Sequence, residues 1–124
     1  MAVPILKQAD ILIASVQEAM SDRDLSQLRD DLTNRIGTSH SSGVVIDVSA
    51  LDVLDSFAAR ILRDIAESSR LRGAETVIVG IQPDVAIAMV RLGLLLGGTT
   101  TAHDLEHGLE LIARRVGKSH LGGW

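Results

Sequence analysis

The sequence contains no cysteine and no tyrosine, and it has a single phenylalanine, Phe57, and a single tryptophan, Trp124. The absence of cysteine excludes disulfide bonds, thiolate metal ligands and thiol nucleophiles. With so few aromatic rings, the chain has no platforms on which nucleic-acid bases could stack. The 124 residues fit one domain, and because 46% of them are hydrophobic, aliphatic side chains must fill its core.

The sequence also lacks clustered positive charge and long apolar runs. The net charge is −4 at pH 7 and basic residues are interspersed with acidic ones, so nucleic acid is not an expected partner. No run of about 18 apolar residues occurs, and the first residues do not form a secretory signal. We therefore expect a cytoplasmic protein that does not associate with membranes.

Hydrophobic periodicity predicts an α/β fold with a mixed, mostly parallel sheet of four to five strands and about four helices. Strands are expected at residues 5–6, 11–16, 44–48 and 76–79, and helices at residues 25–36, 56–72, 83–92 and 105–116. The first two strands should form a hairpin, whereas the later strands alternate with helices and should pair in parallel. Residues 97–100 predict a turn, with room for a short edge strand.

Capping residues give the expected helix ends. Asp24 should be the N-cap of the first helix, and Gly37 should end it. A capping box from Thr101 to Asp104 should precede the last helix. Residues 117–124 lack periodicity and should form a loose tail.

The segment VVIDVSALDVLDSF, residues 44–57, is the most informative part of the chain. A buried strand leads through an acidic turn to Ser56, which we expect at the start of the following helix. An exposed serine there lies beside unpaired backbone N–H groups that favour an added phosphate. The local residues by themselves favour an ordinary N-cap at Ser56, because capping serines far outnumber regulated ones; Asp55 could instead be the N-cap and leave the Ser56 hydroxyl facing solvent.

Acidic residues and histidines in two segments superficially suggest metal sites. Asp47 and Asp52 follow a strand, as magnesium ligands do in some phosphotransfer domains, but a third carboxylate at suitable spacing is missing. His103 and His107 are one helical turn apart but lack the glutamate placement of an H-E-x-x-H zinc motif. We predict no bound metal and no cofactor.

Three short segments give weaker indications. Residues 117–119, GKS, resemble the end of a phosphate-binding loop, but Ile112 stands where that motif needs glycine. Residues 97–100, GGTT, could cradle an anion before a helix, although such a segment is more often a plain turn. The leucines at 94–96 could form an interface or complete the core, and the sequence favours neither.

Three longer segments resemble the STAS-domain family, and within it the RsbS-type branch of stressosome scaffold proteins. They are GVVIDVSALDVLDSFAARIL, VGIQPDVAIAMVRLG and TAHDLEHGLELI, and the likeness covers residues 4–116. The Asp55-Ser56 pair at a helix start resembles anti-anti-sigma factors generally, whereas Phe57 and the turn at residues 80–83 resemble the RsbS-like branch. The resemblance implies one STAS domain over residues 1–116 and a flexible C-terminal tail over residues 117–124.

The resemblance further implies a non-enzymatic regulator of the general stress response. Similar proteins assemble with sensor-carrying RsbR-type paralogues into a large cytoplasmic particle that binds a serine/threonine switch kinase of the RsbT type. The kinase phosphorylates the serine that matches Ser56 and is released toward a pathway that ends at an alternative sigma factor. A PP2C-like serine phosphatase of the RsbX type restores the ground state. The residues expected to contact the kinase are Asp52, Asp55, Phe57, Gln82 and Pro83.

Two other functions remain open at this point. A free anti-anti-sigma factor would bind one anti-sigma kinase without building a particle. A small serine hydrolase would use Ser56 as its nucleophile, but Leu54 and Ala58 stand where a nucleophile elbow has glycines. No histidine in the sequence has a clear claim to be the base of such an enzyme.

Overall fold

The structure is a computed structural model that describes residues 4–97 and 99–122, with residues 96, 97 and 116–122 described as backbone only. Its elements in chain order are β1 (Ile5–Gln8), β2 (Ile11–Ser15), α1 (Asp22–Ser39), β3 (Gly43–Asp47), α2 (Ser56–Leu71), β4 (Glu75–Val79), α3 (Pro83–Arg91), a 3-10 helix η1 (Leu94–Gly97), β5 (Thr100–Ala102) and α4 (Leu105–Gly122).

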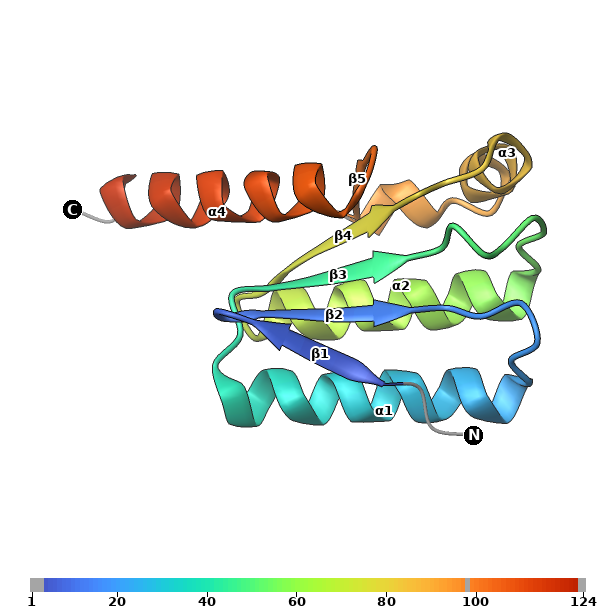
Figure 1. Cartoon of the computed structure of the whole chain (residues 1–124), viewed down its shortest axis with the longest axis horizontal. Helices are drawn as coiled ribbons and strands as arrows, with labels where there is room; N and C mark the ends of the chain where they lie inside the picture. Colours follow the sequence, from blue (N-terminus) through green and yellow to red (C-terminus); the bar gives the residue numbers. More distant parts are fainter. Residues whose placement is uncertain (1–3, 98, 123–124) are drawn as a thin grey trace.

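The five strands lie side by side in the same order as in the sequence, β1-β2-β3-β4-β5 (Figure 1). The strands β1 and β2 form an antiparallel hairpin, and every later pairing is parallel. The central strand is β3, whose residues 44–46 are fully buried because helices cover both of its faces. These observations confirm the predicted α/β class, the mixed and mostly parallel sheet, and the opening hairpin.

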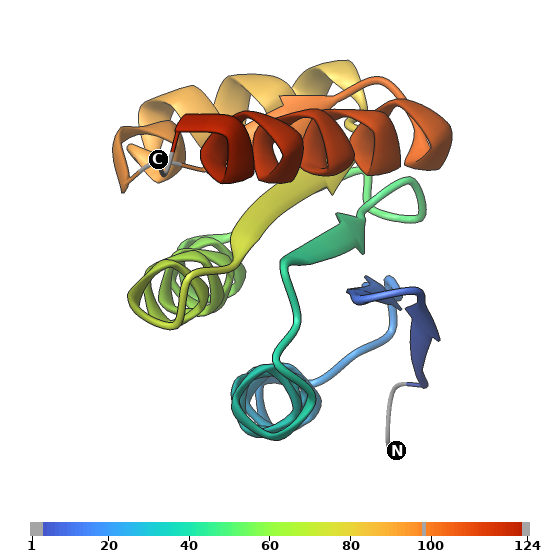
Figure 2. The same ribbon diagram turned by 90° about the vertical axis from the view of Figure 1, so that its left-hand side faces the viewer.

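The helices lie in two layers, with α1 and α2 on one face of the sheet and α4 on the other (Figure 2). The larger core lies under α1 and α2 and includes Leu12, Leu32, Ile46, Ile61 and Ile78. The smaller core lies under α4 and consists of Ile11, Ile13, Val45, Val77, Val79, Ala102 and Ile112. Aliphatic side chains fill both cores, as the composition predicts.

The helix α4 approaches the sheet closely at two glycines. A Cβ atom on Gly108 would lie 2.9 Å from Cγ1 of Val79, and one on Gly43 would lie 2.7 Å from Cδ1 of Ile112. Real Cβ atoms do not come this near to other carbon atoms, so these two positions allow the helix and the sheet to touch.

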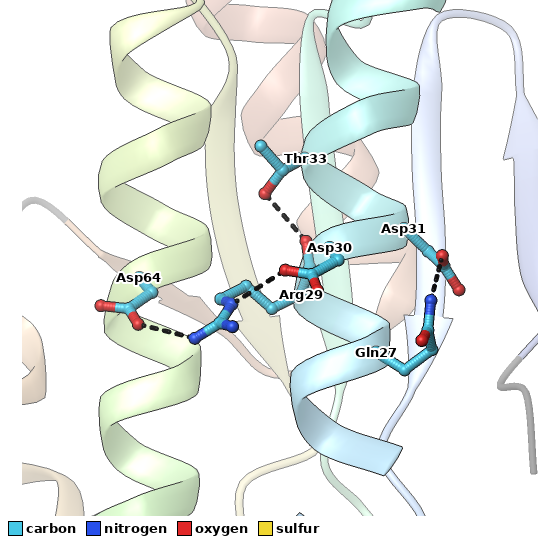
Figure 3. Close-up of polar contacts among 6 residues, drawn as sticks. All are labelled: Gln27, Arg29, Asp30, Asp31, Thr33 and Asp64. Carbon is cyan, nitrogen blue, oxygen red and sulfur yellow. Dashed lines mark hydrogen bonds and ion pairs between the residues drawn. The ribbon is translucent and has the colours of Figure 1, made fainter. Parts of the chain in front are cut away.

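A cluster of polar side chains joins α1 to α2 on the surface (Figure 3). The guanidinium of Arg29 pairs with Asp64 of α2 through Nη1 and Oδ2 at 3.3 Å, and with Asp30 of its own helix through Nε and Oδ1 at 3.3 Å. The hydroxyl of Thr33 donates to the carbonyl of Arg29 at 2.8 Å. Because these groups are partly exposed, each ion pair contributes at most about 1 kcal/mol, and the apolar contacts hold the two helices together.

The observed helix ends differ from the predicted ones. Ser21, not Asp24, is the N-cap of α1, and Asp24 is the third residue of a capping box in which each side chain accepts from the other's backbone N–H. The helix passes through Gly37 and ends before His40, which has a φ of +50°. At the other end of the chain, Thr101 lies in β5 rather than at the cap of α4.

The predicted tail also differs from the structure. The backbone of α4 continues without interruption from Leu105 through Gly122, so residues 117–122 are helical rather than loose. Once a helix has formed, each added residue gains one backbone hydrogen bond, and two glycines do not stop it.

Gly98 and Trp124 lie outside the described residues. In the part of the chain that the structure describes, no helix has the length and apolarity needed to cross a membrane.

Candidate functional site

The loops that follow β3 and β4 meet at the carboxyl edge of the sheet, where hydrogen bonds join them. The backbone N–H of Val48 donates to the carbonyl of Val79 at 3.0 Å, which ties the start of the β3–α2 loop to β4. The N–H of Ser49 donates to Oδ1 of Asp47 at 2.8 Å. Nε2 of Gln82 donates to the carbonyl of Ser49 at 2.8 Å. The loop that leads to Ser56 is therefore held in place by its neighbour.

Gly80 is required by this arrangement. Its φ of +72° lies in the left-handed region that favours glycine. A Cβ atom here would also lie 2.9 Å from Oδ1 of Asp47 and 2.9 Å from Cβ of Ser49. The β3–α2 loop can pack against the end of β4 only because this position has no side chain.

Ser56 is the first residue of α2, and its neighbour Asp55 is the N-cap. Oδ1 of Asp55 accepts the backbone N–H of Ala58 at 2.8 Å, while its carbonyl accepts that of Ala59 at 3.0 Å. Ser56 is exposed, and its hydroxyl makes no hydrogen bond to any residue that the structure describes. Of the two alternatives that the sequence leaves open, the structure therefore selects Asp55 as the cap.

This assignment predicts a difference between two neighbouring aspartates. The Asp55→Ala variant should lose about 1 kcal/mol in free energy of unfolding, because an N–H at the start of α2 loses its acceptor. The control Asp52→Ala removes an exposed carboxylate that makes no hydrogen bond within the described residues, and it should change stability by less than about 0.5 kcal/mol. Urea unfolding of both variants measures the difference, and equal losses would contradict the assignment.

Ser56 opens onto a groove of about 470 Å³ between the start of α2 and the helix α3. Its polar lining consists of Ser56, Asp84 and Arg91. Its apolar lining consists of Leu54, Ile87, Ala88 and Leu92. A second groove, of about 250 Å³, lies on the other side of the loop and is lined in part by Asp52, Val53 and Asp55.

The structure separates the predicted kinase-contacting residues into two groups. Asp52 and Asp55 are exposed in the loop that leads to Ser56, and Pro83 is exposed at the first turn of α3. Phe57 is half-buried against the larger core, and Gln82 is half-buried with its amide bound to the loop. Phe57 therefore anchors the start of α2 to the core, and Gln82 holds the β3–α2 loop.

Sequence reasoning missed several exposed residues around Ser56. Val53 is 71% exposed in the acidic turn, and Ile87 of α3 is 50% exposed in the groove. Asp84 and Arg91 are on the same wall of the groove as Ile87. The sequence does contain one indication of this wall. Asp84, Ile87 and Arg91 are three and four residues apart, which is the spacing of side chains on one face of a helix.

The other predicted candidates lie apart from this groove. The backbone N–H of His103 donates to Nδ1 of His107 at 3.2 Å, and that of His107 donates to Oδ1 of Asp104 at 2.9 Å, so these groups cap α4. Among the described residues, no three or more histidine, aspartate or glutamate side chains are grouped to hold a metal ion. Of the leucines at residues 94–96, Leu94 is fully buried and Leu95 is 41% exposed.

The fold corresponds to a known family. The model of the STAS domain matches residues 2–103, and the chain belongs to the STAS-domain family. It is similar to RsbS of Moorella thermoacetica, which was solved as a serine-to-glutamate variant. The two are 37% identical with a TM-score of 0.84, over 92% of this chain and 97% of that one.

Two further proteins are similar to this chain. A structure described as the molecular architecture of the stressosome, a signal integration and transduction hub, is 37% identical with a TM-score of 0.80, covering 91% of this chain and 98% of that one. The RsbT co-antagonist protein RsbRA of Bacillus subtilis is 30% identical over 84 residues, which are 68% of this chain and 31% of RsbRA. The chain therefore spans about a third of the length of that curated relative.

Proposed function

We propose that this chain is a non-catalytic scaffold subunit of a stressosome-type particle, and that it binds a serine/threonine switch kinase which phosphorylates Ser56. The observation that carries the proposal is the exposed Ser56 hydroxyl, free of hydrogen bonds to the described residues because Asp55 provides the N-cap. The 37% identity to RsbS over nearly the whole of both chains supports the scaffold role.

Phosphorylation would change the surface and leave the fold intact. A phosphate adds about −1.5 to −2 charges at neutral pH. The start of α2 would favour it by about 0.3–1 kcal/mol at this exposed position. Asp52 and Asp55 lie in the same loop, so the modified loop becomes strongly acidic. Such a loop repels an acidic partner surface and attracts a basic one, which is how the modification would alter kinase binding.

The proposed partners follow from the relatives. RsbRA and RsbRD of Bacillus subtilis are named as RsbT co-antagonists, and both match only part of their length to this chain. We therefore include RsbR-type paralogues in the particle, the RsbT-type kinase as its ligand and an RsbX-type phosphatase as the enzyme that removes the phosphate. The proposed compartment is the cytoplasm.

The decisive experiment compares Ser56, at the start of α2, with Ser49, in the loop before it. Incubation with an RsbT-type kinase and ATP, followed by mass-spectrometric mapping, should place one phosphate on Ser56. The Ser56→Ala variant should take up no phosphate, and its melting temperature should be unchanged, because the hydroxyl stabilises nothing in the fold. The matched control Ser49→Ala, also exposed, should be phosphorylated normally. Persistent phosphate uptake by Ser56→Ala would refute the proposal.

Solution mass and turnover separate this proposal from the other two functions. Mixed with RsbR-type paralogues, the chain should enter a large particle; a monomer or dimer in that mixture would support a free anti-anti-sigma factor. The groove lined by Ser56 contains no histidine among the described residues, which disfavours a hydrolase. Ester hydrolysis that depends on Ser56 would restore that alternative.

A further inference from the structure

The groove beside Ser56 is lined by an arginine as well as by the serine. Ser56, at the start of α2, and Arg91, at the end of α3, line the same groove. We propose that Arg91, assisted by Arg60, binds the phosphoryl group of phosphorylated Ser56 and thereby closes this groove. The inference rests on the proposed function, because it requires a phosphate on Ser56.

Both arginines are available for this contact. Arg91 and Arg60 are exposed, and neither makes an ion pair or a hydrogen bond with its side chain to any residue that the structure describes. Arg60 follows Ser56 by four residues on α2, and helical side chains lean toward the N-terminus of the helix, so its guanidinium can reach toward Ser56. A guanidinium can give two parallel hydrogen bonds to phosphate oxygens.

The two walls of the groove are joined by a third arginine. Nη2 of Arg63, on α2, donates to the carbonyl of Leu92 at 2.6 Å, and Leu92 directly follows Arg91. This bond fixes the end of α3 against α2. The end of α3 is therefore already in place against α2, and the long side chain of Arg91 can extend from it along the groove that Ser56 also lines.

The acidic groups near Ser56 direct the phosphate toward the arginines. The carboxylate of Asp55 is held at the backbone of Ala58, and Asp52 is exposed in the preceding loop. Asp84 also lines the groove, but it precedes Arg91 by seven residues, or about 10 Å along α3. These carboxylates repel the phosphate, and Arg91 and Arg60 attract it. Both effects favour a phosphate that lies over the groove near the end of α3.

Closing the groove has a consequence beyond charge. Leu54, Ile87, Ala88 and Leu92 form an apolar lining that is open in the unmodified chain. A phosphate bound to Arg91 lies over this lining and blocks the entry of an apolar side chain from a partner. Phosphorylation then acts by covering this apolar lining as well as by making the loop acidic.

The test uses a chain with phosphoserine introduced at position 56 during synthesis, so that no kinase is needed. A ³¹P NMR titration measures the midpoint of the second phosphate ionisation, which nearby cations lower. Arg91→Gln should raise this midpoint by about 0.5 pH unit, Arg60→Gln by less, and Arg91→Lys should restore most of the difference. The control Arg70→Gln, an exposed arginine at the far end of α2, should leave the midpoint unchanged.

A second readout reports on the groove itself. The methyl NMR signals of Ile87 should shift between the unmodified and the phosphoserine chain, and this shift should be lost in Arg91→Gln. An unchanged midpoint together with an unchanged Ile87 shift in Arg91→Gln would overturn the inference. Failure of the kinase to modify Ser56 would instead overturn the proposed function and would leave this titration unaffected.

Discussion

Replacing Gly80 by alanine is expected to lower the free energy of unfolding by about 3 kcal/mol. About 1 kcal/mol comes from placing a residue with a Cβ at a φ of +72°, and about 2 kcal/mol from crowding. The new Cβ would meet Asp47 and Ser49, each at 2.9 Å, and would push the β3–α2 loop outward. Because that loop positions Ser56, we also expect slower phosphorylation of the folded variant. Urea unfolding and initial rates of phosphate transfer measure the two effects.

Gly73 provides a matched control for this substitution. Its φ is +82°, but a Cβ at this exposed position would meet no atom within 4 Å. The Gly73→Ala variant should therefore lose only about 1 kcal/mol, from backbone strain alone, and should be phosphorylated at the normal rate. Equal losses in the two variants would show that the loop does not depend on the close approach at Gly80.

The second large effect is expected at the smaller core. Ile112 is fully buried between α4 and the sheet, and its side chain fills the space above Gly43. The Ile112→Ala variant should lose about 3 kcal/mol, because the removed methyl groups leave a cavity that the surrounding strands cannot close. Denaturant unfolding followed by circular dichroism measures the loss.

An exposed leucine of the same helix is the control for Ile112. Leu105 is 37% exposed at the first turn of α4, so Leu105→Ala should lose about 1 kcal/mol or less. Both variants should still be phosphorylated below their melting temperatures, since Ser56 lies at the start of α2 and not beneath α4. Similar stability of the two variants would mean that α4 is not held by this contact.

Most of the fold could be predicted because its strands and helices have clear patterns. The solid apolar run at residues 44–46 is typical of a strand covered on both sides, and β3 is such a strand. The helical spacing of Leu25, Leu28, Leu32 and Ile36 predicts one buried face, and all four are buried in α1. These patterns depend on the chain alone and need no knowledge of its neighbours.

Helix ends were harder to predict because several residues compete for each end. Serine and aspartate are about equally good N-caps, and Ser21 and Asp24 stand at the spacing that lets both take part. Gly37 did not end α1. A glycine inside a helix lowers its stability by only about 1 kcal/mol relative to alanine, and the buried side chain of Ile36 packs this part of α1 against the core. His40 adopts the left-handed conformation expected of a glycine there.

The candidate site could be predicted only in its local part. Ser56 follows a buried strand and an acidic turn, so its place at a helix start could be predicted from neighbouring residues. The groove could not, because Asp84, Ile87 and Arg91 belong to another helix and resemble an ordinary solvated surface. The role of Gln82 in holding the loop was also hidden, since a hydrogen bond to a backbone carbonyl leaves no pattern in the sequence.

The coincidence of chain order and spatial order in the sheet bears on how the molecule forms. Each strand pairs with the one synthesised just before it, so a nascent chain emerging from the ribosome can extend the sheet one strand at a time. The strands β1 and β2 are synthesised before β3, and α4, which covers the second face, follows all five strands in the chain. Throughout translation, the growing sheet has two open edges, β1 and the newest strand, and only the second one changes as synthesis proceeds.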